Sequence, residues 1–137
     1  MKYRIPFLLL AFLLTFFAAN AQQSDSTLHY PILIKFQSQC CGVPDEKPLL
    51  TAIKLFKKKY HIKKITAYHI GPMGREGEYY IGLPLKEMNR SLRITLIKKI
   101  KKVSATMKEK GNVECEENAT INKAKLPVRA TIEKIKF

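Results

Sequence analysis

The N-terminal segment sets how much of the chain is left to fold. Lys2 and Arg4 precede an apolar run over 5–17, and small residues close this run at 19–21. This is the pattern of a secretory signal peptide with its cleavage site. A membrane-spanning helix needs about 20 apolar residues, and this run is shorter. Residues 1–21 are therefore expected to be a signal peptide that is removed during export.

The remaining chain is short and basic. Residues 22–137 suit one domain with one modest core, with a flexible polar lead-in over 22–29 and a single domain over 30–137. The leader carries two of the 25 basic residues and none of the 11 acidic ones, which leaves a formal charge of +12. We expect an exported protein, periplasmic or secreted and soluble after cleavage, with no transmembrane segment. Its expected partner is a protein or envelope component, or an anionic surface.

Apolar residues recur with the periods of strands and helices along the first half of the domain. Alternation from Ile32 to Ser38 predicts a strand with one wet face. Pro44-Asp45 and then Pro48 predict the start of a helix. Its expected buried stripe is Leu49, Ile53, Phe56 and Tyr60. Two β-rich segments, 62–70 and 78–85, flank a glycine-rich turn and predict a hairpin.

A second amphipathic helix is predicted from near Lys86 to Gly111-Asn112, where the glycine would supply a left-handed cap. Its expected buried residues are Met88, Leu92, Leu96, Ile100, Val103 and Met107. Segment 113–125 is mixed in character, and alternation over 128–137 predicts a last strand. The tail therefore contributes either one strand or two.

This order of elements predicts an α+β fold. Strand, helix, strand, strand, helix, strand is the order of a ferredoxin-like βαββαβ sandwich, with two helices on one face of an antiparallel sheet. In that arrangement three connecting segments share one end of the sheet. They are the loop with Cys40-Cys41-Gly42, the hairpin turn at 73–77 with His69 just before it, and the segment 114–117 with Cys115. We therefore expect any functional site at this end.

The three cysteines allow three interpretations. Cys115 would form a disulfide with Cys40 or Cys41, because the last strand is expected to pair with the first and the compartment is oxidising. Alternatively, Cys40, Cys41, Cys115 and the imidazole of His69 would bind a soft metal, Cu(I) or Zn. A third interpretation is thiol redox chemistry, in which a helix N-terminus stabilises the thiolate of Cys40 or Cys41. No organic cofactor is expected.

The first cysteine loop carries a resemblance to a known family. Gln39-Cys40-Cys41-Gly42 lies between the first predicted strand and the first predicted helix. In this position the chain resembles heavy-metal-associated domains, which are ferredoxin-like and carry a Met-x-Cys-x-x-Cys loop there. The resemblance is one of topology over residues 30–137, and the two cysteines of this chain are adjacent. It implies a soft metal bound through the cysteine loop.

The sequence contains no catalytic signature. A Ser-His-Asp context, Gly-x-Ser-x-Gly and His-Glu-x-x-His are all absent. We therefore expect a non-enzymatic binding or interaction module.

Charged side chains offer two further candidate contacts. Arg75 and Glu76, at the tip of the hairpin, are either solvated charges or contacts to a partner. A basic strip on the second helix is either a solvated face or a site for polyanions or an anionic surface. It consists of Lys86, Arg90, Lys98, Lys101 and Lys102. Aromatic residues do not alternate with these charges, so no specific nucleic-acid ligand is expected.

Overall fold

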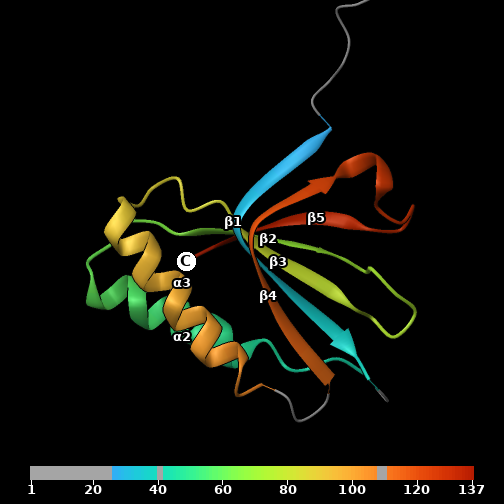
Figure 1. Ribbon diagram of the computed structural model, residues 1–137, viewed down its shortest axis with the longest axis horizontal. Helices are drawn as coiled ribbons and strands as arrows, with labels where there is room; N and C mark the ends of the chain where they lie inside the picture. Colours follow the sequence, from blue (N-terminus) through green and yellow to red (C-terminus); the bar gives the residue numbers. More distant parts are fainter. Residues whose placement is uncertain (1–25, 40–41, 108–110) are drawn as a thin grey trace, which may run out of the picture.

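The computed structural model describes residues 26–39, 42–107 and 111–137. The elements follow in the order β1, α2, β2, β3, α3, β4, η1 and β5 (Figure 1). Their bounds are β1 Thr27–Ser38, α2 Lys47–Lys59, β2 Thr66–Gly71, β3 Tyr79–Leu83, α3 Arg90–Ser104, β4 Gly111–Asn122, the 3₁₀ turn η1 Lys123–Lys125, and β5 Thr131–Lys136. The fold is therefore α+β. No helix within these described ranges has the length and apolar character needed to cross a membrane.

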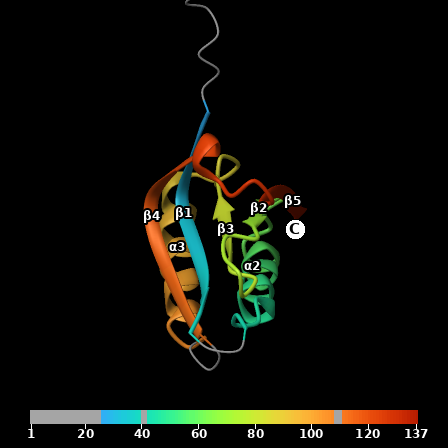
Figure 2. The same cartoon turned by 90° about the vertical axis from the view of Figure 1, so that its right-hand side faces the viewer.

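One antiparallel sheet of five strands organises the molecule, in the order β4-β1-β3-β2-β5. The β1–β4 pair is the longest and extends from Thr27↔Asn122 to Ser38↔Gly111. Figures 1 and 2 show α2 and α3 side by side on one side of the sheet. We call the other side the open face. The η1 segment and residues 126–130 link β4 at one edge to β5 at the opposite edge.

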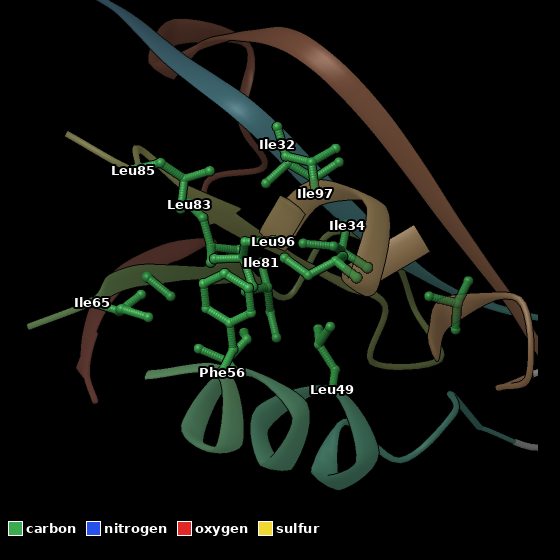
Figure 3. Packing of buried hydrophobic residues seen from close by; sticks show 14 of the residues in the cluster. Ile32, Ile34, Leu49, Phe56, Ile65, Ile81, Leu83, Leu85, Leu96 and Ile97 are labelled. Carbon is green, nitrogen blue, oxygen red and sulfur yellow. The ribbon is translucent and has the colours of Figure 1, made fainter. Parts of the chain in front are cut away.

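The main core lies between the helices and the sheet (Figure 3). Leu49 and Ile53 of α2 and Leu96 of α3 are fully buried, because they recur at helical spacing on the faces turned to the sheet. They meet Ile32 and Ile34 of β1 and Ile81 and Leu83 of β3. Burial of each such side chain contributes about 1.5–3 kcal/mol. Asn89 begins α3, because its side-chain oxygen accepts a hydrogen bond of 2.9 Å from the backbone N–H of Leu92.

A smaller apolar cluster covers part of the open face. Tyr30, Leu33, Ile70, Ala119 and Ile121 are its buried members. Even-numbered β1 residues from Ile32 onwards face the helices, whereas Tyr30 faces the open side, so the alternation of β1 changes at Pro31. Opposite Pro31, Asn118 adopts a φ of +53°. The N-terminal arm of β1, Thr27–Tyr30, consequently bends over the open face (Figure 1).

The structure corrects several expected boundaries. β1 begins at Thr27, so part of the expected lead-in over 22–29 is strand. α3 begins at Arg90 instead of near Lys86, and it ends at Ser104. Gly111 begins β4 and does not cap a helix; a Cβ there would lie 2.3 Å from the backbone oxygen of Gln37, so glycine permits the close approach of the two strands.

The tail contributes two strands, which is one of the two outcomes that the sequence left open. The partner of β1 is β4, not the last strand over 128–137 that the sequence analysis placed there. That last strand, β5, covers Thr131–Lys136 and pairs with β2 at the other edge of the sheet.

Candidate functional site

The end of the sheet that carries the cysteine loop is only partly described. Cys40 and Cys41 lie outside the described residues, so the predicted disulfide, metal site and redox site at these positions remain predictions. β1 ends at Ser38 beside Gly111, the first residue of β4, and Phe36 lies opposite Tyr79, which follows the hairpin turn. The end of β1 and the starts of β3 and β4 therefore meet at one end of the sheet, but the segment 114–117 that was expected there lies within β4.

Cys115 does not lie in a connecting segment, which corrects the sequence-based expectation. It is the cross-strand partner of Ile34, in the middle of β4, and the side chain faces α3. Four residues separate Ile34 from Ser38, which places Cys115 about 13 Å from the end of β1. Cys115 is a half-buried free cysteine. Burial raises the pKa of its thiol, and the nearby hydroxyl of Ser104 on α3 acts in the opposite direction.

The structure does not bring His69 and Cys115 together. They face the same side of the sheet in one cross-strand row, with Ile81 and Ile34 between them. Three strand spacings, about 14 Å, separate the two positions, so they are too far apart to ligate one metal ion. Across the residues described, no three His, Cys, Asp or Glu side chains gather into a group suited to a metal.

Instead, His69 belongs to an aromatic stack. Its ring lies 4.5 Å from the ring of Tyr79, which stacks in turn on Phe36 at 4.5 Å. Burial raises the pKa of the Tyr79 hydroxyl, and the neighbouring carboxylate of Glu46 raises it further. This cluster fixes the start of α2 against the hairpin end of the sheet. Structural packing therefore accounts for the position of His69.

The hairpin tip presents Arg75 and Glu76 to solvent. The backbone N–H of Glu76 donates a hydrogen bond of 3.0 Å to the carboxylate of Glu78, within the turn. Arg129, from the segment between η1 and β5, donates to the carbonyl oxygen of Gly74. This contact could not be predicted from the sequence, because no local pattern connects positions 74 and 129. The turn is thus held by the rest of the domain while its tip stays exposed.

The two helices form a surface of one charge sign. Between them α2 and α3 contain eleven Lys and Arg residues and no Asp or Glu. We name the exposed basic side chains of both helices the helical layer: Lys47, Lys54, Lys58, Lys59, Arg90, Lys98, Lys99, Lys101 and Lys102. The predicted basic strip supplies four of these nine. The contribution of α2 was missed, because only the apolar stripe of that helix was used in the sequence-based prediction.

Lys86 lies outside this helical layer, which corrects its expected place on the second helix. It precedes α3 and lines a cavity near the open face. Two members of the layer have described ion pairs: Lys101 with Glu117 of β4, and Lys47 with Asp45, which precedes α2, at 3.7 Å. Leu55 and Ile94 of the same helices are 58% and 45% exposed. The outer surface therefore combines many cations with two large apolar side chains.

Comparison of the chain with protein-family models, curated proteins and solved structures found no significant match to any of them.

Proposed function

We propose that this protein is an exported, non-enzymatic binding module that attaches to anionic lipid surfaces through its helical layer. The observation that carries the proposal is the charge of α2 and α3, which hold eleven basic and no acidic residues. Basic residues near an anionic lipid surface each contribute about 1 kcal/mol at moderate ionic strength. The nine exposed cations of the helical layer therefore supply ample attraction without any insertion of a helix.

The arrangement of the helices supports a surface as the partner. Both helices lie on the same side of the sheet, so their outer side chains face one direction (Figure 2). Their apolar stripes are already buried in the core, and Leu55 and Ile94 remain exposed. Contact with lipid would thus be mainly electrostatic, with two apolar side chains near the headgroups.

Acidic residues of the sheet lie away from this surface or on its rim. Glu116 forms an ion pair with Lys35 on the open face, with 2.6 Å between the carboxylate oxygen and the ammonium nitrogen, and this contact raises the pKa of Lys35. Glu117 pairs with Lys101 at the border between β4 and α3. The two sides of the molecule therefore differ in charge: the sheet carries both signs, and the helices carry cations alone.

We also infer that β4-β1-β3-β2 with α2 and α3 is a ferredoxin-like unit and that β5 is an addition to its β2 edge. The strand order and the antiparallel pairing support this inference. The soft-metal and redox alternatives depend on Cys40 and Cys41, so no described contact favours either of them.

The test is co-sedimentation of the exported protein with vesicles. One set contains phosphatidylcholine alone, and the other contains three parts phosphatidylcholine to one part phosphatidylglycerol. We expect binding to the second set only, with a steep fall as salt rises. Substitution of Lys54, Lys58, Lys98 and Lys102 by Gln should abolish most of the binding to the vesicles that contain phosphatidylglycerol.

The matched control carries the same loss of charge outside the helices, at Lys64, Lys123, Lys125 and Lys134. It should keep most of the vesicle binding. Equal loss in both variants would show that net charge alone acts, and the proposed surface would be wrong. Binding to heparin without binding to vesicles would identify an anionic glycan as the partner and would also contradict the proposal.

A further inference from the structure

A pocket of about 610 Å³ lies at the open face, where the N-terminal arm of β1 bends over β2 and β5. It is lined by segments that are far apart in the sequence: the arm of β1, the start of β2, the segment after β3, η1 and β5. A pocket of this size is in the range of small-molecule sites. It lies away from the helical layer, because no residue of α2 or α3 lines it.

Four lysines surround this pocket, and we name it the lysine pocket: Lys64, Lys86, Lys123 and Lys134. All four are exposed, so their ammonium groups are free to reorient toward a ligand. Glu87 is the one acidic residue of the lining, and its carboxylate accepts a hydrogen bond of 3.2 Å from the hydroxyl of Thr66. The lining therefore has a formal charge of +3.

Two tyrosines contribute to the wall of the pocket. The rings of Tyr30 and Tyr68 lie 6.2 Å apart and are tilted by 54°. Tyr30 is 3% exposed, and its burial raises the pKa of the hydroxyl to about 12. Ile132 of β5 adds an apolar side chain. The wall thus offers neutral rings and an aliphatic group beneath a cationic rim.

We propose that the lysine pocket binds a small organic molecule that carries two phosphoryl groups. Each phosphoryl group carries a charge of roughly −1.5 to −2 at neutral pH, so two of them match the charge of the lining. The cations of the lining are all lysines, whose ammonium groups act as compact point charges and bind the tetrahedral phosphoryl group from several directions. The tyrosine wall accommodates the compact organic body between the two charges.

Two sources supply this chemistry, a soluble sugar bisphosphate and a phosphorylated lipid headgroup. The experiment is isothermal titration calorimetry of the exported protein with fructose 1,6-bisphosphate and, separately, with dibutanoyl phosphatidylinositol 4,5-bisphosphate, whose short chains form no vesicles. We expect saturable binding of at least one probe. Tighter binding of the sugar bisphosphate assigns a soluble ligand, and tighter binding of the headgroup probe assigns a lipid. Failure of both probes to bind overturns the proposal.

Variants separate this pocket from the helical layer. Lys64→Gln with Lys134→Gln should weaken binding roughly tenfold or more, because each removes a charge-assisted contact. Lys54→Gln with Lys98→Gln removes the same charge from the helices and should change the affinity less than about twofold. An equal loss of affinity in both double variants would show that binding depends on net charge alone, and this result would overturn the proposed pocket. Thermal unfolding of each variant establishes that it is folded.

The same variants distinguish the two proposals of function. Binding of the bisphosphate probe without binding to phosphatidylglycerol vesicles would support the lysine pocket and contradict the proposed lipid surface. Binding to the vesicles without binding of either bisphosphate probe would support the lipid surface and overturn the pocket proposal. Each outcome therefore decides one site independently of the other.

Discussion

The ring of Tyr30 on β1 lies against the backbone of Gly82 on the neighbouring strand β3. A Cβ at position 82 would lie 2.7 Å from both Cδ1 and Cε1 of this ring. Gly82 is also the cross-strand partner of Tyr68, whose ring is the neighbour of Tyr30. The absence of a side chain at Gly82 therefore lets the arm of β1 close over the sheet and form the wall of the lysine pocket.

Gly82→Ala should destabilise the fold by about 1–3 kcal/mol, because the new methyl group overlaps a buried ring that cannot move without exposing the cluster on the open face. Urea unfolding measures the change. In a Tyr30→Ala background the same substitution should cost much less, because the overlapping ring is absent. An equal cost in both backgrounds would contradict the contact and would attribute the effect to the backbone of β3.

Tyr30 also predicts a loss of stability at high pH. The pKa of its hydroxyl is raised to about 12 in the folded chain, from an ordinary value of 10.0, mainly by burial. The stabilising contribution is complete below the ordinary pKa and is lost as pH rises toward the folded value, because the unfolded chain releases its proton first.

Relative to Tyr30→Phe, the wild type should therefore lose about 1.4 kcal/mol between about pH 8 and about pH 11. Urea unfolding at both pH values measures this difference, and the phenylalanine variant removes the ionising group while it keeps the ring. A constant difference across this range would show that Tyr30 ionises equally in both states. The pKa of Tyr79 is also raised, but this residue is present in both proteins, so its ionisation does not affect the comparison.

Sequence periodicity predicted the parts of the fold that bury a regular apolar stripe. Leu49, Ile53 and Phe56 were expected on one face of a helix, and all are buried in the core. β4 was left open by the sequence, because it is an edge strand in which Glu114, Glu116 and Glu117 interrupt the apolar pattern. Pairing with β1, which is not encoded locally, stabilises β4 despite these charges.

The candidate sites were less predictable than the fold. The helical layer could be found in part, because the charge of each helix is visible in its own sequence. The lysine pocket could not, because its four lysines come from four separate segments that meet only through the bend at Pro31. His69 was a candidate metal ligand in one of the three interpretations, and no local pattern indicates its stacking on Tyr79.

The bend in the β1–β4 pair predicts that position 118 tolerates glycine better than a β-branched residue. Asn118 has a φ of +53°, a left-handed conformation that asparagine and glycine adopt more readily than other residues. Asn118→Gly should change stability by less than about 0.5 kcal/mol, and Asn118→Val should cost about 1–2 kcal/mol. Thermal unfolding of the two variants measures the contrast, and equal effects would contradict the backbone conformation assigned here.

Cys115 should react slowly as a thiol. In a variant with Cys40→Ser and Cys41→Ser, it is the remaining cysteine of the chain. Burial raises the pKa of its thiol, and the thiolate is the reactive form, so alkylation by iodoacetamide at neutral pH should be at least about tenfold slower than in urea. Mass spectrometry over time gives both rates. Equal rates would contradict its placement against α3 and would support a reactive role.

The pair of Glu117 and Lys101 links the proposed lipid surface to the sheet. Both side chains are about half exposed, at 46% and 47%, so the ion pair contributes little to stability. Glu117→Gln should therefore change the free energy of unfolding by less than about 1 kcal/mol. It also frees Lys101 and removes an acidic group from the rim of the helical layer. Binding to vesicles that contain phosphatidylglycerol should accordingly become about twofold to fivefold tighter.

Glu133→Gln is the matched control, because it removes the same charge from β5, at the sheet edge farthest from β4. It should alter vesicle binding less than Glu117→Gln does, because screening limits the reach of a charge to about a Debye length. Co-sedimentation at two salt concentrations separates the effects, since the gain from Glu117→Gln should shrink as salt rises. A larger gain from Glu133→Gln would place the contact surface on the β5 side of the molecule and would contradict a contact at the border between α3 and β4.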